Sequence, residues 1–408
     1  MTEGFNRKTL VVMVAAAAIL MITMGIRQSL GLFIAPIIDT THVGYAAMSF
    51  AMAVGQLMWG AAQPTFGALA DRFGPYRTLL AGALMMAIGS ALTPLASNEF
   101  TLIATIGMLT AAGAGAGSFG VLIGVVAQRV PPHRRSVASG FVNAGGSLGQ
   151  FVFAPLNQFL ISSITWMGAM WSMAGAALAT IPLARALTRN TDAALLSAAT
   201  HGSSALSMRE QLAIAVRDRS YWCLHAGFFT CGFHIAFLVT HLPGEVRLCS
   251  LPAAVAASSI SIIGLANVAG SLWAGWAGGV YRMKYLLFFN YLSRAVIVAL
   301  YLVAPKTQWT FYLFAAALGF TWLATVPPTA GLIGKLFGVR YLATLFGLTT
   351  FTHQIGAFFG AWLGGLALVR FGDYSWMWYA DMALAVMAAF ANLPIREAPL
   401  RSAAAQPA

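Results

Sequence analysis

An arginine stands alone in the first apolar segment of the chain. Arg27 follows Gly25 in the run LMITMGIRQSLGLFIAPI, and no other charged residue occurs between Lys8 and Asp39. An ionisable side chain near the middle of a segment that is long enough to cross a bilayer is costly unless it faces a polar cavity or a partner. We therefore expect Arg27 to bind either a ligand or an acidic side chain of the protein.

Further polar side chains lie at a similar depth in other apolar segments. A histidine occurs 207 residues after Arg27, at the corresponding place in the seventh segment, and the eleventh segment carries another histidine followed by a glutamine. For an amide or histidine considered alone, the alternative to ligand binding is a hydrogen bond between helices. Together with Arg27, we expect the following residues to face one central site: Gln56, Gln150, His234, Asn267, Trp322, His353 and Gln354.

The distribution of acidic residues favours an anionic ligand. The chain has only 11 Asp and Glu residues, and Asp381 is the one that lies well inside an apolar segment. The first half therefore offers Arg27 no acidic partner within the membrane, although a buried structural ion pair remains the alternative. A guanidinium group presents two parallel donors that match a carboxylate, so the sequence predicts an organic anion as the ligand.

Composition places the whole chain in the membrane. The sequence is 59% hydrophobic and 8% charged with a mean hydropathy of +0.77, whereas soluble domains carry about 25% charged residues. The net charge of +12 comes from cations scattered between apolar runs, with no basic stripe, so we expect no nucleic-acid partner. The three cysteines form no CxxC pair, and we predict no metal site and no cofactor.

Motifs of nucleotide hydrolysis and of metalloprotease chemistry are missing. No Walker A or HExxH sequence occurs, so the chain is not expected to be an enzyme or to hydrolyse ATP. The segment from Gly115 to Gly120 matches the dinucleotide fingerprint formally. No strand precedes this segment and it lies within an apolar run, so we interpret its small residues as helix-packing surface.

Twelve apolar segments are long enough to span a bilayer. Lys and Arg concentrate in the connections on one side, together with both termini, which by the positive-inside rule predicts that this side is cytoplasmic. The first segment lacks a cleavage site and is expected to be retained. The predicted spans are 10–38, 45–68, 76–97, 100–127, 137–160, 165–186, 220–244, 253–277, 285–304, 309–334, 341–367 and 374–394.

The spans form two sets of six. A polar interruption separates residues 1–186 from residues 220–408, and its second part, Met208 to Arg219, has the pattern of a short amphipathic surface helix. We expect 187–219 to be a cytoplasmic central loop. A shift of 207 residues aligns Gly25, Arg27 and Pro36 with Gly232, His234 and Pro243, and also aligns glycines of spans 5 and 11. Two such matches at one shift indicate a duplicated six-span unit in parallel orientation, which in transporters places the ligand between the halves.

The loop between spans 2 and 3 carries a specific motif. It runs GALADRFGPYR from Gly67 to Arg77, with Asp71 and Arg72 between them, and physically it is a charge clamp at the membrane surface. The spacing G-x-x-x-D-R-x-G-x-x-R resembles the signature loop of the major facilitator superfamily, and the resemblance covers the entire chain. It implies an all-α integral membrane protein of twelve transmembrane helices in two pseudo-symmetric six-helix bundles, with Gly67, Asp71, Arg72 and Arg77 in conformational gating. The counterpart in the second half has Gly279 at the position of the acid.

Within that superfamily the chain is similar to the bacterial monocarboxylate transporter and oxalate–formate antiporter group. The run GIRQSLGLF and the run FGVRYLATLFG…HQIGAFFGAWLGG carry this resemblance. Relatives also place a cation in span 8, where this chain has Asn267, and oxalate carriers place a lysine where this chain has His353. The resemblance makes span 9 peripheral, which implies a structural role for Arg294, in a pair with Asp381. One fixed cation suits a monocarboxylate.

The sequence therefore predicts a secondary transporter that moves a small organic anion by alternating access. Proton coupling is left open, with a histidine as the carrier if it occurs. The alternative is a proton-driven drug exporter or a transporter of siderophores or other amphiphiles, because the spans are rich in Met and Phe. The predicted location is the bacterial inner membrane, with both termini cytoplasmic, and we expect a monomer surrounded by lipid.

Overall fold

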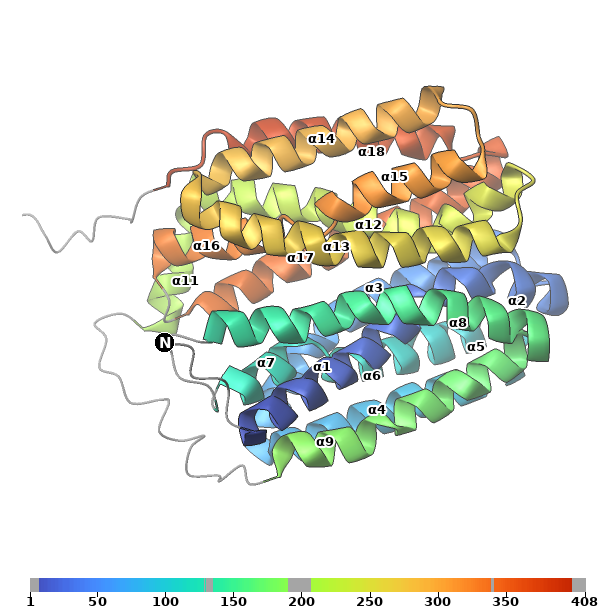
Figure 1. Cartoon of the computed structure of the whole chain (residues 1–408), viewed down its shortest axis with the longest axis horizontal. Helices are drawn as coiled ribbons and strands as arrows, with labels where there is room; N and C mark the ends of the chain where they lie inside the picture. The colour runs from blue at the N-terminus through green and yellow to red at the C-terminus, as the bar shows by residue number, and fades with distance from the viewer. Residues whose placement is uncertain (1–6, 128, 130–134, 190–206, 339–340, 398–408) are drawn as a thin grey trace, which may run out of the picture.

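The computed structural model describes residues 7–127, 129, 135–189, 207–338 and 341–397, and all regular structure among them is helical. The first half comprises α1 (Arg7–Gln28), η1 (Leu30–Phe33), α2 (Ile34–Thr41), α3 (Tyr45–Phe73), α4 (Pro75–Leu92), η2 (Thr93–Leu95), α5 (Glu99–Leu102), η3 (Ile103–Thr110), α6 (Ala111–Ala116), α7 (Phe119–Ala127), α8 (Arg135–Leu178) and α9 (Thr180–Thr188). The second comprises α11 (Met208–Arg217), α12 (Arg219–Leu248), α13 (Ala253–Val280), α14 (Met283–Val303), α15 (Gln308–Thr321), α16 (Val326–Phe337), α17 (Leu342–Phe371) and α18 (Ser375–Asn392). Figure 1 shows the first half below and the second half above.

The helices of the described residues make twelve membrane passes, which confirms the predicted fold class. Nine helical stretches of the described chain are long and apolar enough to cross a bilayer. One of these, Gly140–Thr188, is 49 residues long and provides two passes, because the backbone leaves the helical conformation at Ile164 and Thr165. Two further passes, α3 and α18, are less apolar than the others.

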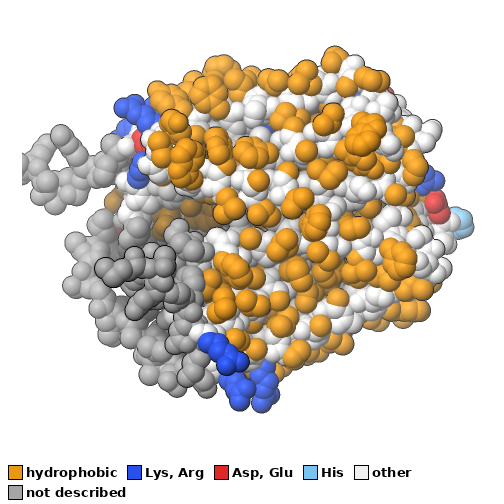
Figure 2. All heavy atoms as spheres, viewed as in Figure 1, with side chains coloured by type: hydrophobic (Ala, Val, Ile, Leu, Met, Phe, Trp, Pro, Cys, Tyr) orange, Lys and Arg blue, Asp and Glu red, His pale blue; other side chains and the backbone are white. Residues whose placement is uncertain are grey.

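Hydrophobic side chains cover the flank of the bundle, while Lys and Arg gather at its ends (Figure 2). Exposed Phe, Leu, Val and Trp side chains project from several peripheral helices, among them Phe159, Trp276, Leu300 and Val303. A soluble protein rarely exposes a continuous apolar surface of this extent. The surface therefore fits a protein whose flank is surrounded by lipid.

The two halves repeat one packing arrangement. In the first half, a Cβ atom built on Gly149 of α8 would lie 2.1 Å from the carbonyl oxygen of Met21 in α1. In the second half, a Cβ atom on Gly356 of α17 would lie 2.0 Å from the carbonyl oxygen of Phe229 in α12. Only glycine permits such backbone contact. The positions aligned by the 207-residue shift thus make equivalent contacts between pass 1 and pass 5, and between pass 7 and pass 11.

The interface between the halves is closed at one end of the bundle. We call the end that holds Arg7 and Asn392 the terminal end, and the opposite end, which holds Thr41 and Leu248, the far end. At the far end the Tyr45 hydroxyl of α3 lies 3.0 Å from Nδ1 of His241 and 2.6 Å from the Tyr374 hydroxyl.

At the far end, therefore, polar side chains of the second half hold the start of pass 2. The exposed ion pair between Asp39 and Arg247, at 3.6 Å, joins the same two halves.

At the terminal end, the surfaces of α3 and α17 that face each other move apart. Along α3, Gly60 contacts Gln354 of α17, whereas Gly67 has nothing within 4 Å of a built Cβ atom. Residues seven apart lie on nearly the same face of a helix, so the separation concerns the face that meets α17. Gly347, seven residues before Gln354 on α17, is equally open.

The second pair of facing helices, α8 and α13, behaves in the same way. Gly264 of α13 would contact the Ser147 carbonyl oxygen at 2.9 Å, while Gly140 and Gly275 have nothing within 4 Å. Both helix pairs are therefore closed from mid-membrane to the far end and open towards the terminal end.

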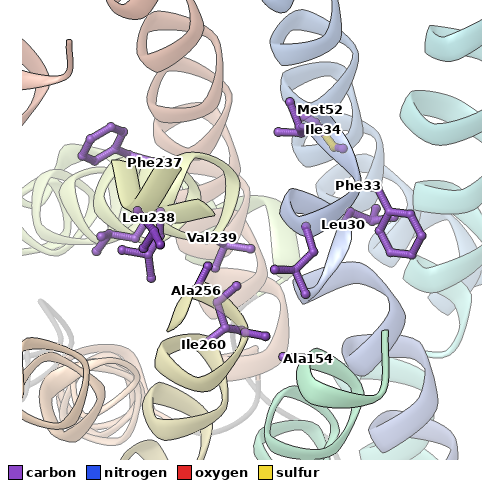
Figure 3. Packing of buried hydrophobic residues seen from close by; sticks show 14 of the residues in the cluster. Leu30, Phe33, Ile34, Met52, Ala154, Phe237, Leu238, Val239, Ala256 and Ile260 are labelled. Atoms are coloured by element: carbon purple, nitrogen blue, oxygen red, sulfur yellow. The ribbon is translucent and has the colours of Figure 1, made fainter. Parts of the chain in front are cut away.

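The largest hydrophobic cluster joins the two halves in the closed region. Leu30, Phe33 and Ile34 come from pass 1, while Phe237, Leu238 and Val239 come from α12. Figure 3 shows these side chains together with Ala256 and Ile260 of α13. Burial of their apolar surface stabilises the closed far end.

Of the predicted central loop 187–219, residues 187–189 and 207–219 are described, with α9 extending to Thr188, and 190–206 lie outside the described residues. The predicted surface helix is present as α11, which begins with a capping box between Ser207 and Glu210. The hydroxyl of Ser207 accepts from the Glu210 amide, and the Glu210 carboxylate accepts from the Ser207 amide, so two otherwise unpaired donors are satisfied. Gln211 of α11 also donates to the Phe337 carbonyl oxygen at 3.1 Å, which ties the helix to the second half.

Candidate functional site

Arg27 lies where pass 1 is interrupted in the membrane. α1 ends at Gln28 and the chain continues through the short η1 turn, so Arg27 occupies the last turn of a helix that ends inside the bundle. A cation is stabilised near the C-terminus of a helix by the partial negative charge of the free carbonyl groups. The sequence signal for this interruption is weak, because Ser29 and Gly31 are the only residues there that disfavour a helix.

The guanidinium of Arg27 has neutral partners from one neighbouring helix. It donates a hydrogen bond to Oε1 of Gln56, and it stacks over the Trp59 ring with 4.1 Å to the ring centroid. Both partners belong to α3. Among the described residues no carboxylate oxygen lies within 4.0 Å of Arg27, and the side chain remains partly exposed. The charge is therefore uncompensated and accessible.

A small cavity adjoins Arg27. Its walls come from both halves and include Gln56, Thr110, Val239 and Thr240. Its volume is about 20 Å³, which is room for about one water molecule. An organic ligand would therefore bind here only after the helices around the cavity move apart.

A second, larger cavity lies directly beyond the first one, towards the far end. It has a volume of about 410 Å³ and is lined mainly by apolar side chains, with Tyr45, Thr240 and Arg247 among its polar members. Gly31 and Thr240 line both cavities. A Cβ atom on Gly31 would lie 2.2 Å from the Val239 carbonyl oxygen, so the backbone contact between η1 and α12 separates the two spaces.

Gln150 and Gln354 carry amide atoms without partners. Both side chains are 1% exposed. Neither amide atom of Gln150 has a hydrogen-bond partner, and Oε1 of Gln354 has none. A buried amide without a partner costs about 1–3 kcal/mol, which makes these atoms suitable for binding a ligand or water. Gln150 packs against Gly264 of the opposite half, and Gln354 packs against Gly60.

His353 keeps a partly exposed imidazole near this interface. Its Nδ1 lies 2.9 Å from Nε2 of Gln354, and its ring meets the edge of Phe228 at a centroid distance of 5.8 Å. The backbone carbonyl of His353 contacts Gly232 of α12. The pair of His353 and Gln354 thus sits where pass 11 meets both pass 7 and pass 2.

His234 does not face Arg27. Its Nδ1 lies 2.5 Å from Oδ2 of Asp381 in α18, and both side chains are 1% exposed or less. The expectation that Asp381 pairs with Arg294 is therefore wrong, because the acid is held by the histidine. Glu245 is a second buried acid within a pass, at 9% exposure, and its carboxylate accepts from the Tyr301 hydroxyl at 2.7 Å. The sequence prediction ended pass 7 one residue too early to include it.

Arg294 is enclosed by the interruption of pass 10. The chain leaves the helix between Thr321 and Val326, and the guanidinium donates to the carbonyl oxygens of Thr321 and Trp322, the latter at 2.6 Å. It also contacts Sγ of Cys231 at 3.3 Å and is 1% exposed. Carbonyls released at a helix end thus accept from a terminal nitrogen of the guanidinium in place of a carboxylate, while Nε has no partner in the described chain.

Asn267 and Trp322 belong to the same interruption. The side-chain carbonyl of Asn267 accepts from the Leu323 amide at 3.0 Å, and its amide nitrogen donates to the Ser147 hydroxyl at 3.0 Å. Asn267 therefore connects pass 8 to pass 5 of the other half and to the broken part of pass 10. The Trp322 ring, 1% exposed, meets the edge of His234 at a centroid distance of 6.0 Å. Both residues have mainly protein partners in this conformation.

The loop motif lies at the terminal end, away from Arg27. Gly67 occupies the open part of the interface and Arg77 is exposed near the start of α4. The side chains of Asp71 and Arg72 lie outside the described ones. Gly74, in the same motif, has φ of +88°, a conformation that favours glycine, and it makes the tight turn between α3 and α4.

The structure thus brings together Arg27 and Gln56, and separately joins His353 to Gln354 and His234 to Trp322. Trp59 is the residue that sequence reasoning missed. Its position three residues after Gln56 places it about one helical turn away on the same face, which was the available signal.

Comparison with known proteins decides the family. The model of the Major Facilitator Superfamily matches residues 13–361. The chain belongs to the major facilitator superfamily. It is a multi-pass membrane transporter and not an enzyme, as the sequence predicted.

Individual relatives are similar over most of this transporter. Monocarboxylate transporter 13 of Rattus norvegicus is 26% identical over 360 residues, which cover 87% of this chain and 81% of that protein. The oxalate:formate antiporter of Oxalobacter formigenes is 25% identical over 374 residues, covering 88% and 85%. The crystal structure of a bacterial homologue of the human lysosomal transporter Spinster, in an inward-facing and unoccupied conformation, superposes with a TM-score of 0.69 at 15% identity over 95% of this chain and 94% of that chain. At that identity the superposition supports the fold alone.

Proposed function

We propose that this transporter moves a small organic anion, most simply a monocarboxylate, by alternating access, with Arg27 as the residue that binds the carboxylate. The observation that carries the proposal is the uncompensated charge of Arg27 beside a cavity bounded by both halves. Relatives named as monocarboxylate transporters and an oxalate:formate antiporter support the same class of ligand.

The partners of Arg27 suit an anion that binds and leaves. A carboxylate accepts two parallel hydrogen bonds from a guanidinium group. While the site is empty, Gln56 and the face of Trp59 share the charge without neutralising it. An incoming carboxylate can therefore take over donors of Arg27 without breaking an ion pair, and Gln56 stays in reach with an amide donor for the ligand.

The number of available cations argues for a single carboxylate group. Arg294, the other arginine inside a pass, is enclosed by carbonyl groups and by Cys231. It cannot reach a ligand unless the broken part of pass 10 rearranges. A dianion would leave one charge unpaired in a site of low dielectric, which is costly.

The cycle follows from the two ends of the interface. The site opens towards the terminal end in this conformation, and the predicted orientation makes that end cytoplasmic, with both termini on the cytoplasmic side of the bacterial inner membrane. To face the other side, the far-end contacts of Tyr45 and the backbone contact of Gly31 must separate. The two cavities that Gly31 divides would then join into one path, while Gly67 and Arg77 lie at the end that closes.

A binding assay tests the proposal directly. Purified protein is heated with a panel of small monocarboxylates, dicarboxylates and lipophilic cations. A ligand at about 100 times its Kd stabilises the native state by roughly 2.7 kcal/mol, so a monocarboxylate should raise the melting temperature. Stabilisation by lipophilic cations alone would favour the drug exporter instead, and an iron-chelating amphiphile in the panel covers the siderophore alternative.

The matched variants are Arg27→Ala and Arg370→Ala. Arg370 is an exposed arginine in the last turn of α17, so its removal changes the net charge equally without touching the cavity. Uptake of a labelled monocarboxylate into proteoliposomes should be lost in the Arg27 variant and kept in the Arg370 variant. Uptake that survives Arg27→Ala would disprove the proposal.

A further inference from the structure

A pair of titratable side chains is buried within the second half, apart from Arg27. Nδ1 of His234 in α12 lies 2.5 Å from Oδ2 of Asp381 in α18, and both side chains are 1% exposed. The other two polar atoms of the pair, Nε2 of the histidine and Oδ1 of the acid, have no hydrogen-bond partner in the described chain. Buried polar atoms nearly always have a hydrogen-bond partner. The lack of one at both members of this pair therefore needs an explanation.

The surrounding charges make the pair suited to one additional proton. With one proton between them, His234 and Asp381 carry a net charge of −1, which balances the +1 of Arg294. Trp322 contacts both groups, because its ring meets His234 and its backbone carbonyl accepts from Arg294. A further proton on Nε2 or on Oδ1 would make the pair neutral without disturbing the existing hydrogen bond.

Other titratable groups near the pair already have partners. Cys231, one turn before His234, contacts Arg294, and Tyr291 of α14 donates to the Gly227 carbonyl oxygen. Tyr301 of α14 is bonded to Glu245. On the remaining helix faces, the titratable groups are His353 of α17, bonded to Gln354, and, towards the far end, His241 and Tyr374, both bonded to Tyr45. Helix α13 has no titratable side chain. Among these groups, the buried lone pairs without a hydrogen-bond partner are those of the pair; farther along α12, Nε2 of His225 also lacks one.

We propose that His234 and Asp381 form the proton-binding site of this transporter, which takes up one proton for each anion carried. The inference rests on the proposed function, because the anion bound at Arg27 supplies the charge that the proton balances. The proton adds to a lone pair that has no hydrogen-bond partner, on Nε2 or on Oδ1, and leaves again on the other side of the membrane. No covalent bond between heavy atoms changes, and one anion with one proton is an electroneutral load.

Contacts connect the two sites. Gly232, two residues before His234, touches the backbone carbonyl of His353 in α17. The next residue of α17, Gln354, packs on Gly60 of α3, one turn from the Gln56 that binds Arg27. A shift of α12 against α18 on protonation would therefore also displace α17. Helix α17 packs on α3, the helix of the other half that carries Gln56. This is contiguous packing between two sites, and the coupling itself is what the experiment measures.

The experiment uses the full-length protein in proteoliposomes with a labelled monocarboxylate. For coupling of one proton to one anion, an inward gradient of one pH unit supports accumulation of about tenfold, because each unit corresponds to about 1.36 kcal/mol. Asp381→Asn and His234→Gln should abolish this accumulation and the substrate-driven proton flux, while exchange of labelled for unlabelled substrate without a gradient continues. His225→Gln is the matched control, because His225 is a buried histidine on the same helix, bonded to Thr352 at 2.7 Å.

Each result decides a different question. Accumulation and proton flux that persist in Asp381→Asn, or wild-type protein that shows no effect of the gradient, would overturn the proton site while leaving the anion site intact. Uptake that survives Arg27→Ala would overturn the proposed function instead. Exchange without a gradient verifies that the Asp381 variant is folded.

If no carboxylate is transported, infrared spectra of the purified protein give the answer without a substrate. Acidification should then produce a protonated carboxyl or imidazolium band in the wild type that Asp381→Asn lacks. Identical spectra would overturn the proposal.

Discussion

Two arginines lie inside the membrane passes, and the protein treats them in opposite ways. Arg27 stands at the end of α1 with an amide and an indole ring as partners, and it remains partly exposed beside a cavity. Arg294 is 1% exposed and is bonded to two backbone carbonyls and a thiol. An arginine thus caps an interrupted helix in the second half, whereas in the first half an arginine presents its charge to a cavity.

The difference teaches how to distinguish a structural cation from a binding cation in a membrane protein. The structural one has its donors directed to carbonyl groups that an interrupted helix leaves free, so its removal leaves those acceptors unpaired. The one proposed to bind a ligand has neutral partners, an amide and an indole ring, that a ligand could displace. Substitutions at both sites should therefore separate stability from transport.

Arg294→Ala should have the largest effect, and on folding. The variant leaves the carbonyl oxygens of Thr321 and Trp322 without a donor, and each buried unpaired group costs about 1–3 kcal/mol, so we expect a loss of roughly 2–6 kcal/mol. Thermal unfolding in detergent measures it. Arg294→Lys should recover part of the loss, since an ammonium group still donates to a carbonyl. A variant with wild-type melting temperature and altered substrate preference would contradict the structural assignment.

Arg27→Ala should come next, and should affect transport alone. Loss of a charged hydrogen-bonding partner for a carboxylate costs about 2–4 kcal/mol of binding, which is roughly 30- to 700-fold in affinity. The melting temperature without ligand should stay the same or rise, because a charge that no acidic side chain compensates is removed. Calorimetric titration with a monocarboxylate measures the loss. A large drop in stability of the ligand-free variant would show that Arg27 has a structural role.

Trp59→Leu should have a smaller effect at the same site. It keeps an apolar wall and removes the aromatic face that lies 4.1 Å from the guanidinium carbon. Cation–π contacts are worth about 0.5–2 kcal/mol, so affinity should change by roughly 2- to 30-fold. Trp59→Phe, which retains an aromatic face, should fall between leucine and wild type in the same titration. Equal behaviour of the two variants would mean that only the volume at this position matters.

Tyr45→Phe should have the smallest effect, because it concerns the interface and leaves both arginines intact. Removal of the hydroxyl deletes the bonds to His241 and Tyr374 at the far end. Each hydrogen bond contributes a net amount of about 0.5–1.5 kcal/mol, so the far-end-open state should gain population. Leu30 lines the cavity beside Arg27, so labelling of Leu30→Cys with a membrane-impermeant reagent in the Tyr45→Phe background, against the same cysteine with Tyr45 intact, measures accessibility from the far side. Equal labelling rates would show that the tyrosine does not hold the gate.

The passes themselves could be predicted because they depend on length and hydrophobicity alone. The repeat was visible because backbone contact admits only glycine, so Gly149 and Gly356 are aligned by the same shift that aligns Gly25 and Gly232. Arg27 stood out because a lone charge in an apolar run costs free energy however the helix is rotated about its axis. In each of these cases the sequence property and the physical requirement are local.

The partners of buried polar groups could not be predicted in this way. His234 and Asp381 are 147 residues apart, and their contact depends on how passes 7 and 12 are rotated about their axes. The role of Arg294 depends on the interruption of pass 10, for which Pro327 and Pro328 were a signal, since residues before proline avoid the helical conformation. Long-range rotation and helix breaks thus decide which polar residues reach the cavity.

The polar nature of the far-end contacts bears on how quickly the protein can turn over. Opening there exposes the hydrogen bonds of Tyr45 and the ion pair of Asp39 with Arg247, and water can replace each of these partners as they separate. An exposed ion pair contributes about 0–1 kcal/mol, and each hydrogen bond only slightly more. A latch of this kind holds one conformation by a small margin, so its release is compatible with the microsecond-to-millisecond times of domain motions. Passage of the solute would then be limited by the separation of the apolar surfaces around Leu30 and Val239 and not by the polar latch.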